Sequence, residues 1–285
     1  MGAYSIFKDT ICDMTWLEVD EASKRGAIML VPIGVIEQHG PHLPLGTDIY
    51  GAYLLCCLAK SYLRKKNIVS VIAPPYYFGM NESTGMFPGS INIRQESMIN
   101  MLVDLFVSYG KHGFKRQFVL NHHGDPRHNL AIFGAILNAR GQDIDSVCIM
   151  RPSTERAYKK GGVILPDTAI IRPVESTRTT RARAKLIKSQ LHIHAEERET
   201  SLMMRWYPNL LKKRGKIKTF KPVLPGPEAF ERAESGGKWR EISPQGYIGD
   251  PSVATEENGD LYVYEASDIA NAIAEHIRRE PQVWS

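Results

Sequence analysis

The stretch AIMLVPIGVIEQHGPHLPLGTD, residues 27–48, contains the two features that decide the fold. Its first part, 27–34, is a nearly unbroken apolar run that ends at a glycine, which is typical of a β-strand buried on both faces. Its second part is rich in glycine, proline, histidine and carboxylates, and it predicts a long polar loop. The stretch therefore indicates a buried strand that ends at a loop carrying ionisable side chains.

Short apolar runs alternate with longer segments of helical periodicity up to residue 150. Further strands are predicted at 68–73, 117–120 and 146–150, and helices at 48–63, 95–112 and 127–140. This alternation predicts an α/β fold with a mostly parallel sheet and helices on both faces. Ligands of such sheets bind beyond the carboxyl ends of the strands, so the polar segments after the first and third strands lie where a site is expected.

The pattern is looser in the C-terminal third. Residues 151–175 are mixed in character, helices are predicted at 178–188, 202–211 and about 267–279, and a long irregular segment is predicted at 221–249. The sequence has no internal repeat and no low-complexity tract. We therefore expect one domain over 1–285 with an elaborated C-terminal third.

The composition is that of a globular protein. Apolar residues make up 43% of the 285 residues and charged residues 24%, which argues against a disordered or fibrous chain. The net charge of +5 falls short of a nucleic-acid-binding composition. No stretch approaches the ~20 apolar residues of a membrane span, and the first residues lack a signal-peptide pattern. With four cysteines and no CxxC pair, we expect a cytoplasmic protein without nucleic-acid or membrane partners.

Residues 37–48, EQHGPHLPLGTD, place carboxylates and imidazoles in one loop after the first strand. Glu37 and His39 are two residues apart, so in an extended chain they point the same way, and a turn at 40–41 would bring Asp48 back to them. Imidazole and carboxylate are the ligands that Zn²⁺, Mn²⁺ and Fe²⁺ prefer. The alternative is a polar loop in which Asp48 caps the following helix.

Two further clusters follow. NHHGD at 121–125 adds His123 and Asp125 after the third strand, although Asp125 could instead cap the next helix. Two such clusters at the ends of two strands of one sheet favour a metal site over two ordinary loops. The third cluster, HIHAEERETS at 192–201, offers an imidazole and a carboxylate as general acid and partner, or as a further ligand. Alone, it would indicate a solvated stretch.

Together these segments resemble the creatininase (creatinine amidohydrolase) family. Its motifs E-Q-H-G-P-H-L-P-L-x-T-D, N-x-H followed closely by a carboxylate or glycine, and H-A-G-x-x-E-T-S correspond to 37–48, 121–125 and 194–201. Weaker matches are FPGS at 87–90, and GDP and AT between 249 and 255. The resemblance runs from residue 37 to about 259, and its first motif is long and specific.

The resemblance implies a creatininase-like, three-layer Rossmann-like sandwich with two divalent ions per chain (Zn²⁺, Mn²⁺ or Fe²⁺). It also implies a homo-oligomer, usually a hexamer, that acts on a small-molecule substrate. One ion would take Glu37, Asp48 and His123. The other would take His39, Asp48 and Asp125, so that Asp48 bridges the two ions.

The resemblance also implies the catalytic groups. His194 would carry a proton to the leaving group, with Glu199 beside it as an orienting partner. Asp125 stands where the family has a longer glutamate, so Glu199 would replace it as a ligand if Asp125 cannot reach. A metal-bound hydroxide would attack a carbonyl and open a small polar cyclic amide.

Departures from the motifs argue against creatinine as the substrate. Glu196 replaces a glycine, Asn81 stands in place of a substrate-contacting serine, and no tryptophan lies at 140–205, where creatinine amidohydrolases place indoles over the substrate. With Asn121, these residues predict a substrate-binding pocket for a hydroxylated molecule. The alternatives are carbon–carbon ring opening of an oxidised inositol (a diketo-inositol) and hydrolysis of a formamide on a pyrimidine nucleotide.

Other interpretations are weaker. The basic run over 178–188 could bind a substrate phosphate, but we favour a solvated helix face or subunit contact because exposed Lys/Arg faces are common. A dinucleotide-binding oxidoreductase is rejected, since GVIE at 34–37 stands where GxGxxG is required. A scaffold that has lost its activity is disfavoured because the candidate ligands are all present.

Overall fold

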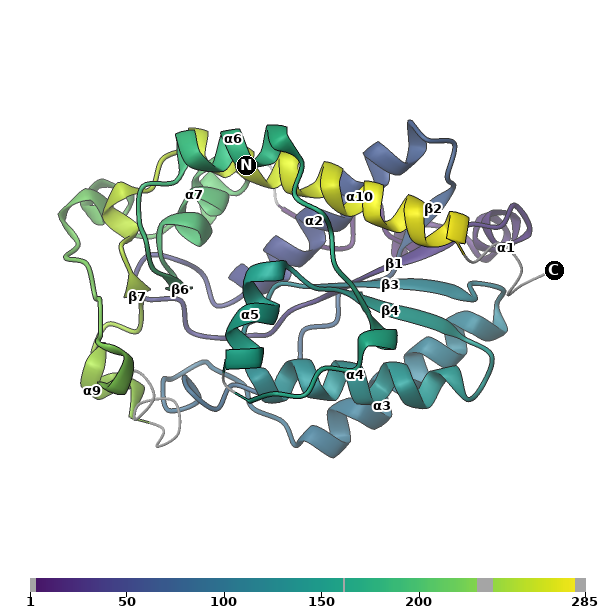
Figure 1. Cartoon of the computed structure of the whole chain (residues 1–285), viewed down its shortest axis with the longest axis horizontal. Coiled ribbons are helices and arrows are strands. Elements are labelled where there is room, and N and C mark those ends of the chain that lie inside the picture. The colour runs from purple at the N-terminus through teal and green to yellow at the C-terminus, as the bar shows by residue number, and fades with distance from the viewer. Residues whose placement is uncertain (1–3, 161, 230–237, 280–285) are drawn as a thin grey trace.

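The computed structural model describes residues 4–160, 162–229 and 238–279 (Figure 1). Its centre is a five-stranded sheet of order β2-β1-β3-β4-β5 in which every neighbouring pair is parallel. The strands are β1 Ile28–Ile33, β2 Ser70–Ile72, β3 Arg116–Asn121, β4 Asp145–Ile149 and β5 Ile170–Ile171. The predicted α/β fold with a parallel sheet is confirmed.

Helices cover both faces of the sheet (Figure 1). On one face lie α2 Thr47–Arg64, α7 Glu197–Trp206 and α10 Leu261–Arg279, and on the other lie α1 Trp16–Lys24, α3 Gln95–Lys111 and α4 Pro126–Arg140. Side chains of a strand alternate between faces, so Leu30 of β1 enters the core under α2 and α10, while Met29 enters the core under α3 and α4. The sheet therefore separates two apolar cores.

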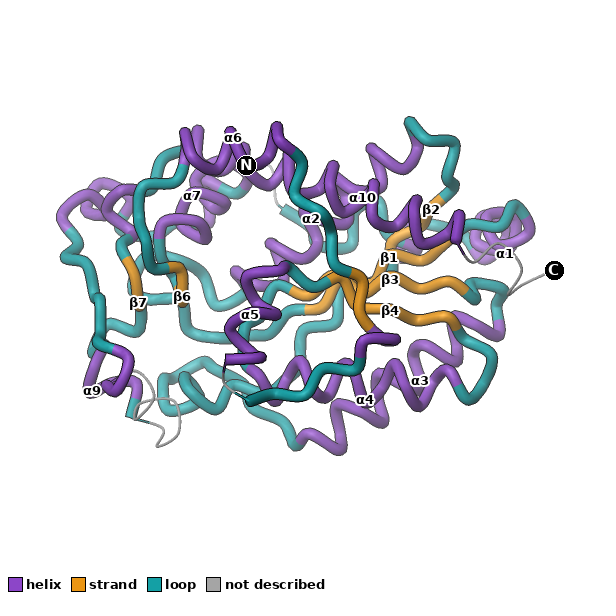
Figure 2. Tube along the Cα trace, viewed as in Figure 1, coloured by secondary structure: helices purple, strands orange, loops and turns teal. Residues whose placement is uncertain are grey.

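The register of the sheet fixes where the polar loops begin. In the β1–β3 pair, Ile33 lies opposite Asn121, so the last residues of both strands are neighbours. The loops that follow them leave the sheet at the same edge (Figure 2). The two motif-bearing segments, 37–48 and 121–125, are thus brought together by strand pairing alone.

Part of the chain after residue 150 lies beyond that edge, while β5, α7 and α10 belong to the sheet and its cover. The elements of this part are α5 Pro152–Lys160, α6 Thr177–Leu186, β6 His192–His194, α9 Trp239–Ile242 and β7 Ile248–Gly249. Strands β6 and β7 form a separate antiparallel ribbon opposite the carboxyl ends of the main strands (Figure 2). Short 3-10 helices lie at Ile11–Asp13, Asp167–Ala169, Pro208–Leu210, Arg214–Thr219, Pro251–Val253 and Glu257–Asp260.

Several predicted boundaries need correction. The helix predicted at 202–211 is α7, which begins earlier because the Glu196 side chain accepts a hydrogen bond from Arg198 N, and which is followed by Pro208. Helix α10 begins at Leu261 rather than near 267. Helix α5 and strand β5 arise from the segment called mixed, and α9 and β7 interrupt the segment predicted as irregular. Residues 230–237 of that segment, and the ends of the predicted 1–285 domain, lie outside the described residues.

Among the described helices, none combines the length and the apolar character that crossing a bilayer requires.

Candidate metal centre

The end of β1 and the start of α2 are held unusually close. A Cβ on Gly34 would lie 2.7 Å from both Asp48 C and Ile49 N, so only glycine allows this approach. Asp48 therefore enters the site from the first turn of α2. The N-cap of α2 is Gly46, without a side-chain hydrogen bond, so the alternative of Asp48 as the cap is not what the structure shows. Its carboxylate is left for the site.

Asp125 caps the N-terminus of α4, which was the alternative role predicted for it. Its side chain accepts hydrogen bonds from Arg127 N and His128 N at the start of α4, and its second oxygen accepts from Glu82 N at 3.1 Å. Both oxygens are used by these backbone groups. Asp125 is in none of the candidate ligand groups that the described residues form, whereas Glu199 is in one of them. The assignment of Asp125 to the second metal site therefore stays a prediction.

The remaining predicted ligands converge. His123 Nδ1 lies 3.0 Å from Glu37 Oε2 and 3.1 Å from Asp48 Oδ2. On the other side of Asp48, Oδ1 lies 3.5 Å from His39 Nε2, and that nitrogen lies 3.8 Å from Glu199 Oε2. Glu37, Asp48 and His123 form one group with ligand atoms within 4.8 Å of one another, and His39, Asp48 and Glu199 form a second. Asp48 is common to both groups, with one oxygen facing each.

Backbone carbonyls fix which ring nitrogens are free. His39 Nδ1 lies 3.0 Å from Glu37 O, and His123 Nε2 lies 2.9 Å from Met80 O. A carbonyl oxygen can only accept, so these nitrogens carry the proton, and the other nitrogen of each ring presents a lone pair to the carboxylates. This is the usual orientation of histidines that bind metal ions.

Three buried ligand atoms have no hydrogen-bond partner among the described residues: Glu37 Oε2, His39 Nε2 and Asp48 Oδ2. Buried polar atoms are rarely left without a partner, because desolvation is costly. Thr84 Oγ1 donates to the other oxygen of Glu37 at 2.5 Å, which turns Oε2 toward His123. The donor set and these unpaired atoms fit divalent cations such as Zn²⁺ or Mn²⁺.

Without a metal ion, protons on the imidazoles balance the negative charge of the carboxylates in the cluster. Burial would lower the pKa of His39, but Asp48 and Glu199 outweigh it and raise the pKa to about 10. Burial would raise the pKa of Asp48, but His39, His122 and His123 hold it well below its usual value. A divalent ion would replace these protons on the imidazoles.

His194 lies beside the cluster, and with Glu37 and His39 it forms a third group of candidate ligand atoms within 4.8 Å of one another. Its Nε2 lies 2.6 Å from Gln38 O, so this nitrogen carries a proton, and it lies 3.9 Å from Glu37 Oε1. Its ring is 4.4 Å from the ring of His39. The next residue, Ala195, has a left-handed backbone with φ 51°, and its N–H donates to Glu199 Oε2 at 2.5 Å. An imidazole whose Nε2–H is held by a backbone carbonyl thus lies at the edge of the cluster.

His122 was given no separate role by the sequence interpretation. Its Nδ1 lies 3.3 Å from Asp48 Oδ1, and its Nε2 lies 3.0 Å from the hydroxyl of Tyr262. A Cβ on Gly51 would lie 2.6 Å from the ring, so a glycine on α2 makes room for it. The HH pair at 122–123 was the available signal, but the sequence does not show which ring faces which partner.

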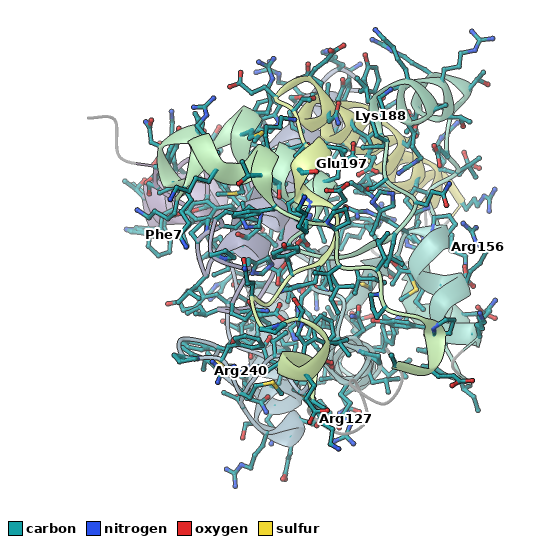
Figure 3. The ribbon with its side chains drawn as sticks, turned by 90° about the vertical axis from the view of Figure 1, so that its left-hand side faces the viewer. Phe7, Arg127, Arg156, Lys188, Glu197 and Arg240 are labelled. Carbon is teal, nitrogen blue, oxygen red and sulfur yellow. The ribbon has the colours of Figure 1, made fainter. Side chains whose placement is uncertain are left out.

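The cluster opens into a cavity of about 750 Å³. Of the predicted site residues, it is lined by Asp48, Asn121, His123, His194, Glu196 and Glu199. Asn81 is not in the lining, and its amide donates to the carbonyl oxygens of Ile36 and Ile91. Its amide nitrogen thus braces the loop, and its predicted contact with substrate stays a prediction. Figure 3 looks onto this end of the molecule, with Arg156 of α5 on one side and Arg240 of α9 below.

Comparisons with known proteins agree with these observations. The sequence model of the creatininase family, described as creatinine amidohydrolase, matches residues 12–276. The mycofactocin precursor peptide peptidase of Mycolicibacterium smegmatis is 27% identical over 257 residues, covering 88% of this chain and 85% of the relative. The 3-dehydro-scyllo-inosose hydrolase of Thermotoga maritima is 30% identical over 113 residues, covering 39% and 34%.

A solved structure of creatinine amidohydrolase (creatininase) has a TM-score of 0.67 at 19% identity and covers 94% of this chain and 97% of that chain. This likeness confirms the creatininase-like sandwich. Because the family model covers most of the sequence, the chain belongs to the creatininase family, whose members are metal-dependent hydrolases.

Proposed function

We propose that the protein hydrolyses a carbon–nitrogen amide bond with two divalent ions held at the shared carboxylate of Asp48. Glu37 and His123 would hold one ion, and His39 and Glu199 the other. The observation that carries this proposal is the set of buried ligand atoms without hydrogen-bond partners on either side of Asp48. The native metal, Zn²⁺, Mn²⁺ or Fe²⁺, is to be found by experiment.

Divalent ions at this position acidify water and polarise a carbonyl oxygen. The residues of the chain supply the remaining steps. Thr84 and the Met80 carbonyl fix the orientation of Glu37 and His123. The Nε2–H of His194 is bonded to the Gln38 carbonyl, so Nδ1 is the ring nitrogen that would take a proton from the attacking water and pass it to the departing nitrogen. Imidazole is suited to this transfer near neutral pH.

The leading substrate class is a small polar cyclic amide other than creatinine. The names of two relatives, a peptidase and an amidohydrolase, both denote cleavage of a carbon–nitrogen bond. A second candidate is carbon–carbon ring opening of an oxidised inositol, which is favoured by the 30% identity to an inosose hydrolase over residues that make up 39% of this chain. A formamide on a pyrimidine nucleotide remains the third.

A substrate panel tests the proposal. Cyclic amides, short peptides, formamides and oxidised inositols would be incubated with protein loaded with Mn²⁺, Zn²⁺ or Fe²⁺, and metal content would be measured in parallel. We expect close to two ions per chain and turnover of an amide. Turnover of the inositol alone would show that a carbon–carbon bond is cleaved and not the proposed amide bond. A chain that binds no ion after reconstitution would refute the metal centre itself.

The homohexamer and the cytoplasmic location are further proposals from family resemblance. Light scattering on the purified chain would test the first, with six times the chain mass of 32.1 kDa as the expected result.

A further inference from the structure

We propose that the end of the cavity remote from the metal-ligand cluster is a binding site for an anionic group of the substrate, a carboxylate or a phosphate, held by Arg151 and Arg183. The inference rests on the proposed function, since the anionic group belongs to the molecule whose amide bond is cleaved. We call this region the arginine end, defined by Arg151, Arg183 and Arg198.

The arginine end is built around one carboxylate. Glu265 of α10 accepts from Arg198 Nη2 at 2.7 Å and from Arg183 Nη2 at 3.0 Å, both through Oε1. Arg151 Nη2 lies 3.5 Å from the other oxygen, too far for a hydrogen bond. Three guanidinium groups from three separate elements of the chain therefore face a single carboxylate.

Neighbouring carboxylates do not complete the pairing. Glu175 accepts from Arg183 Nε at 3.0 Å, and Asp268 is engaged by the backbone N–H of Ser176. Arg151 Nη2 and Arg198 Nε are buried and have no hydrogen-bond partner among the described residues.

Buried guanidinium groups are rarely left in this state, because their N–H groups lose hydration without replacement. Arg198 is 8% exposed, whereas the side chains of Arg151 and Arg183 are 33% and 34% exposed, and all three line the cavity. A planar anion beside Arg151 would supply the acceptor that its Nη2 lacks, since guanidinium binds carboxylate and phosphate in a matching geometry. Arg183, which already donates to Glu175 and Glu265, would add its positive charge.

The arginine end and the metal-ligand cluster line the same cavity. Tyr262 connects them: Arg151 Cζ lies 6.0 Å from the centre of its ring, and its hydroxyl lies 3.0 Å from His122 Nε2. His122 in turn contacts Asp48. A substrate with its amide at Asp48 and its anion at Arg151 would extend along His122 and Tyr262, so the anionic group would be a substituent carried beyond the ring of the cyclic amide. The cavity volume of about 750 Å³ is suited to such a molecule.

The same helix offers a matched control. Arg183 of α6 turns toward Glu265, whereas Arg181, two residues earlier, is exposed and does not line the cavity. The basic run at 178–188 is thus divided: one side chain faces the cavity, and others form the solvated face that the sequence favoured.

The experiment compares two probes of nearly equal shape on the metal-loaded protein. N-acetylglycine carries a carboxylate, and N-acetylglycinamide carries a neutral amide in its place. By calorimetry we expect N-acetylglycine to bind roughly 10- to 100-fold more tightly, the usual effect of charged hydrogen bonds. The preference should be lost in Arg151→Gln and in Arg183→Gln, and kept in Arg181→Gln. Inorganic phosphate as a third probe distinguishes the source: tighter binding than N-acetylglycine indicates a phosphate ester, and weaker binding a carboxylate.

The variants also separate the site from the bound ions, to which carboxylates can bind directly. A preference that persists in both Arg151→Gln and Arg183→Gln overturns the inference, as does equal binding of the two probes to the wild type. Arg151→Lys, which keeps the charge, should retain part of the preference even if Arg183→Gln fails to fold. Turnover in the substrate panel is a separate readout. If an amide is hydrolysed but the two probes bind equally, the proposed reaction stands and the anion site is refuted. If the preference is found but no amide is hydrolysed, the anion site stands and the proposed reaction is refuted.

Discussion

The two ends of the cavity are both densely charged and contain buried polar atoms, but their unpaired atoms have opposite character. At the metal-ligand cluster, carboxylate oxygens and an imidazole nitrogen lack hydrogen-bond partners within the part of the chain that the structure describes. At the arginine end, guanidinium N–H groups lack them. Buried charge that is not balanced within the chain indicates the sign of what binds there. The first end fits cations and the second fits an anion, so one cavity is prepared for both ions and substrate.

The two ends also differ in how their charge responds to pH. The carboxylates of the metal-ligand cluster face imidazoles, which lose their protons when a metal ion binds. Glu265 faces arginines, which stay charged at every accessible pH. Changes at the first end should therefore act on metal content and rate, and changes at the second on stability and substrate affinity.

The largest expected effect is that of His123→Ala. It removes the nitrogen that lies within 3.1 Å of both Glu37 and Asp48, so one ion should be lost and turnover abolished. Metal analysis should fall from about two ions per chain toward one, with the far-ultraviolet circular dichroism unchanged.

His42→Ala is the matched control from the same histidine-rich region. His42 is buried, its Nε2 lies 2.9 Å from Thr200 Oγ1, and its ring packs against Phe220 and Tyr247. We expect it to lower stability but to keep both ions. Equal metal loss in the two variants would show that the assignment of His123 as a ligand is wrong.

His194→Ala should leave metal content intact and lower kcat by ~10²–10⁴-fold, the usual contribution of a general acid. The reason is that the Nε2–H of His194 is held by the Gln38 carbonyl, so that Nδ1 would relay the proton to the departing nitrogen. The measurement is kcat beside metal analysis. Unchanged turnover would remove His194 from the mechanism, and a loss of metal would make it a ligand instead.

At the arginine end, Glu265→Gln should change the acid limb of the stability curve. Burial would raise the pKa of Glu265, but Arg198, Arg151 and Arg183 lower it from 4.5 to about 2. A carboxyl with a lowered folded-state pKa stabilises the protein fully above the unfolded-state value, and this contribution of about 3 kcal/mol is lost as pH falls from about 4.5 toward 2.

Urea unfolding of metal-free protein at a series of pH values checks this prediction. The wild type should be the more stable at pH 7, and the two unfolding free energies should converge as pH falls below 4.5. A constant difference between wild type and Glu265→Gln across this range would mean that Glu265 is not depressed by the arginines.

The metal-ligand cluster was largely predictable from sequence, and the arginine end was not. Glu37, His39 and Asp48 lie within twelve residues of one motif, and parallel strand pairing brings His123 to the same edge of the sheet. The motifs and the predicted alternation of strands and helices are therefore enough to place these four residues together. Whether Asp125 or Glu199 faces the second metal position depends on which backbone N–H groups donate hydrogen bonds to each carboxylate. The spacing of residues in the sequence does not show this.

The arginine end has no local signal at all. Arg151 follows β4, Arg183 lies on α6, Arg198 on α7 and Glu265 on α10, so only packing brings them together. For the same reason α5 was missed: its segment is polar and mixed, and its place over the cavity depends on tertiary contacts rather than on an apolar stripe.

The smallest effect is expected from Gly34→Ala, which tests how the metal end is positioned. The new methyl group would lie 2.7 Å from the backbone of Asp48 and Ile49, so α2 must shift, at a typical overpacking cost of about 1–3 kcal/mol. Because Asp48 moves with α2 while His123 stays on the β3 loop, metal affinity should fall together with stability. The arginine end has no such contact, so the preference for N-acetylglycine should persist. Gly215→Ala, where an added Cβ meets nothing within 4 Å, is the control. Titration of apo-protein with Zn²⁺ would decide: an unchanged affinity in Gly34→Ala would show that the approach of α2 to β1 does not set the position of the bridging carboxylate.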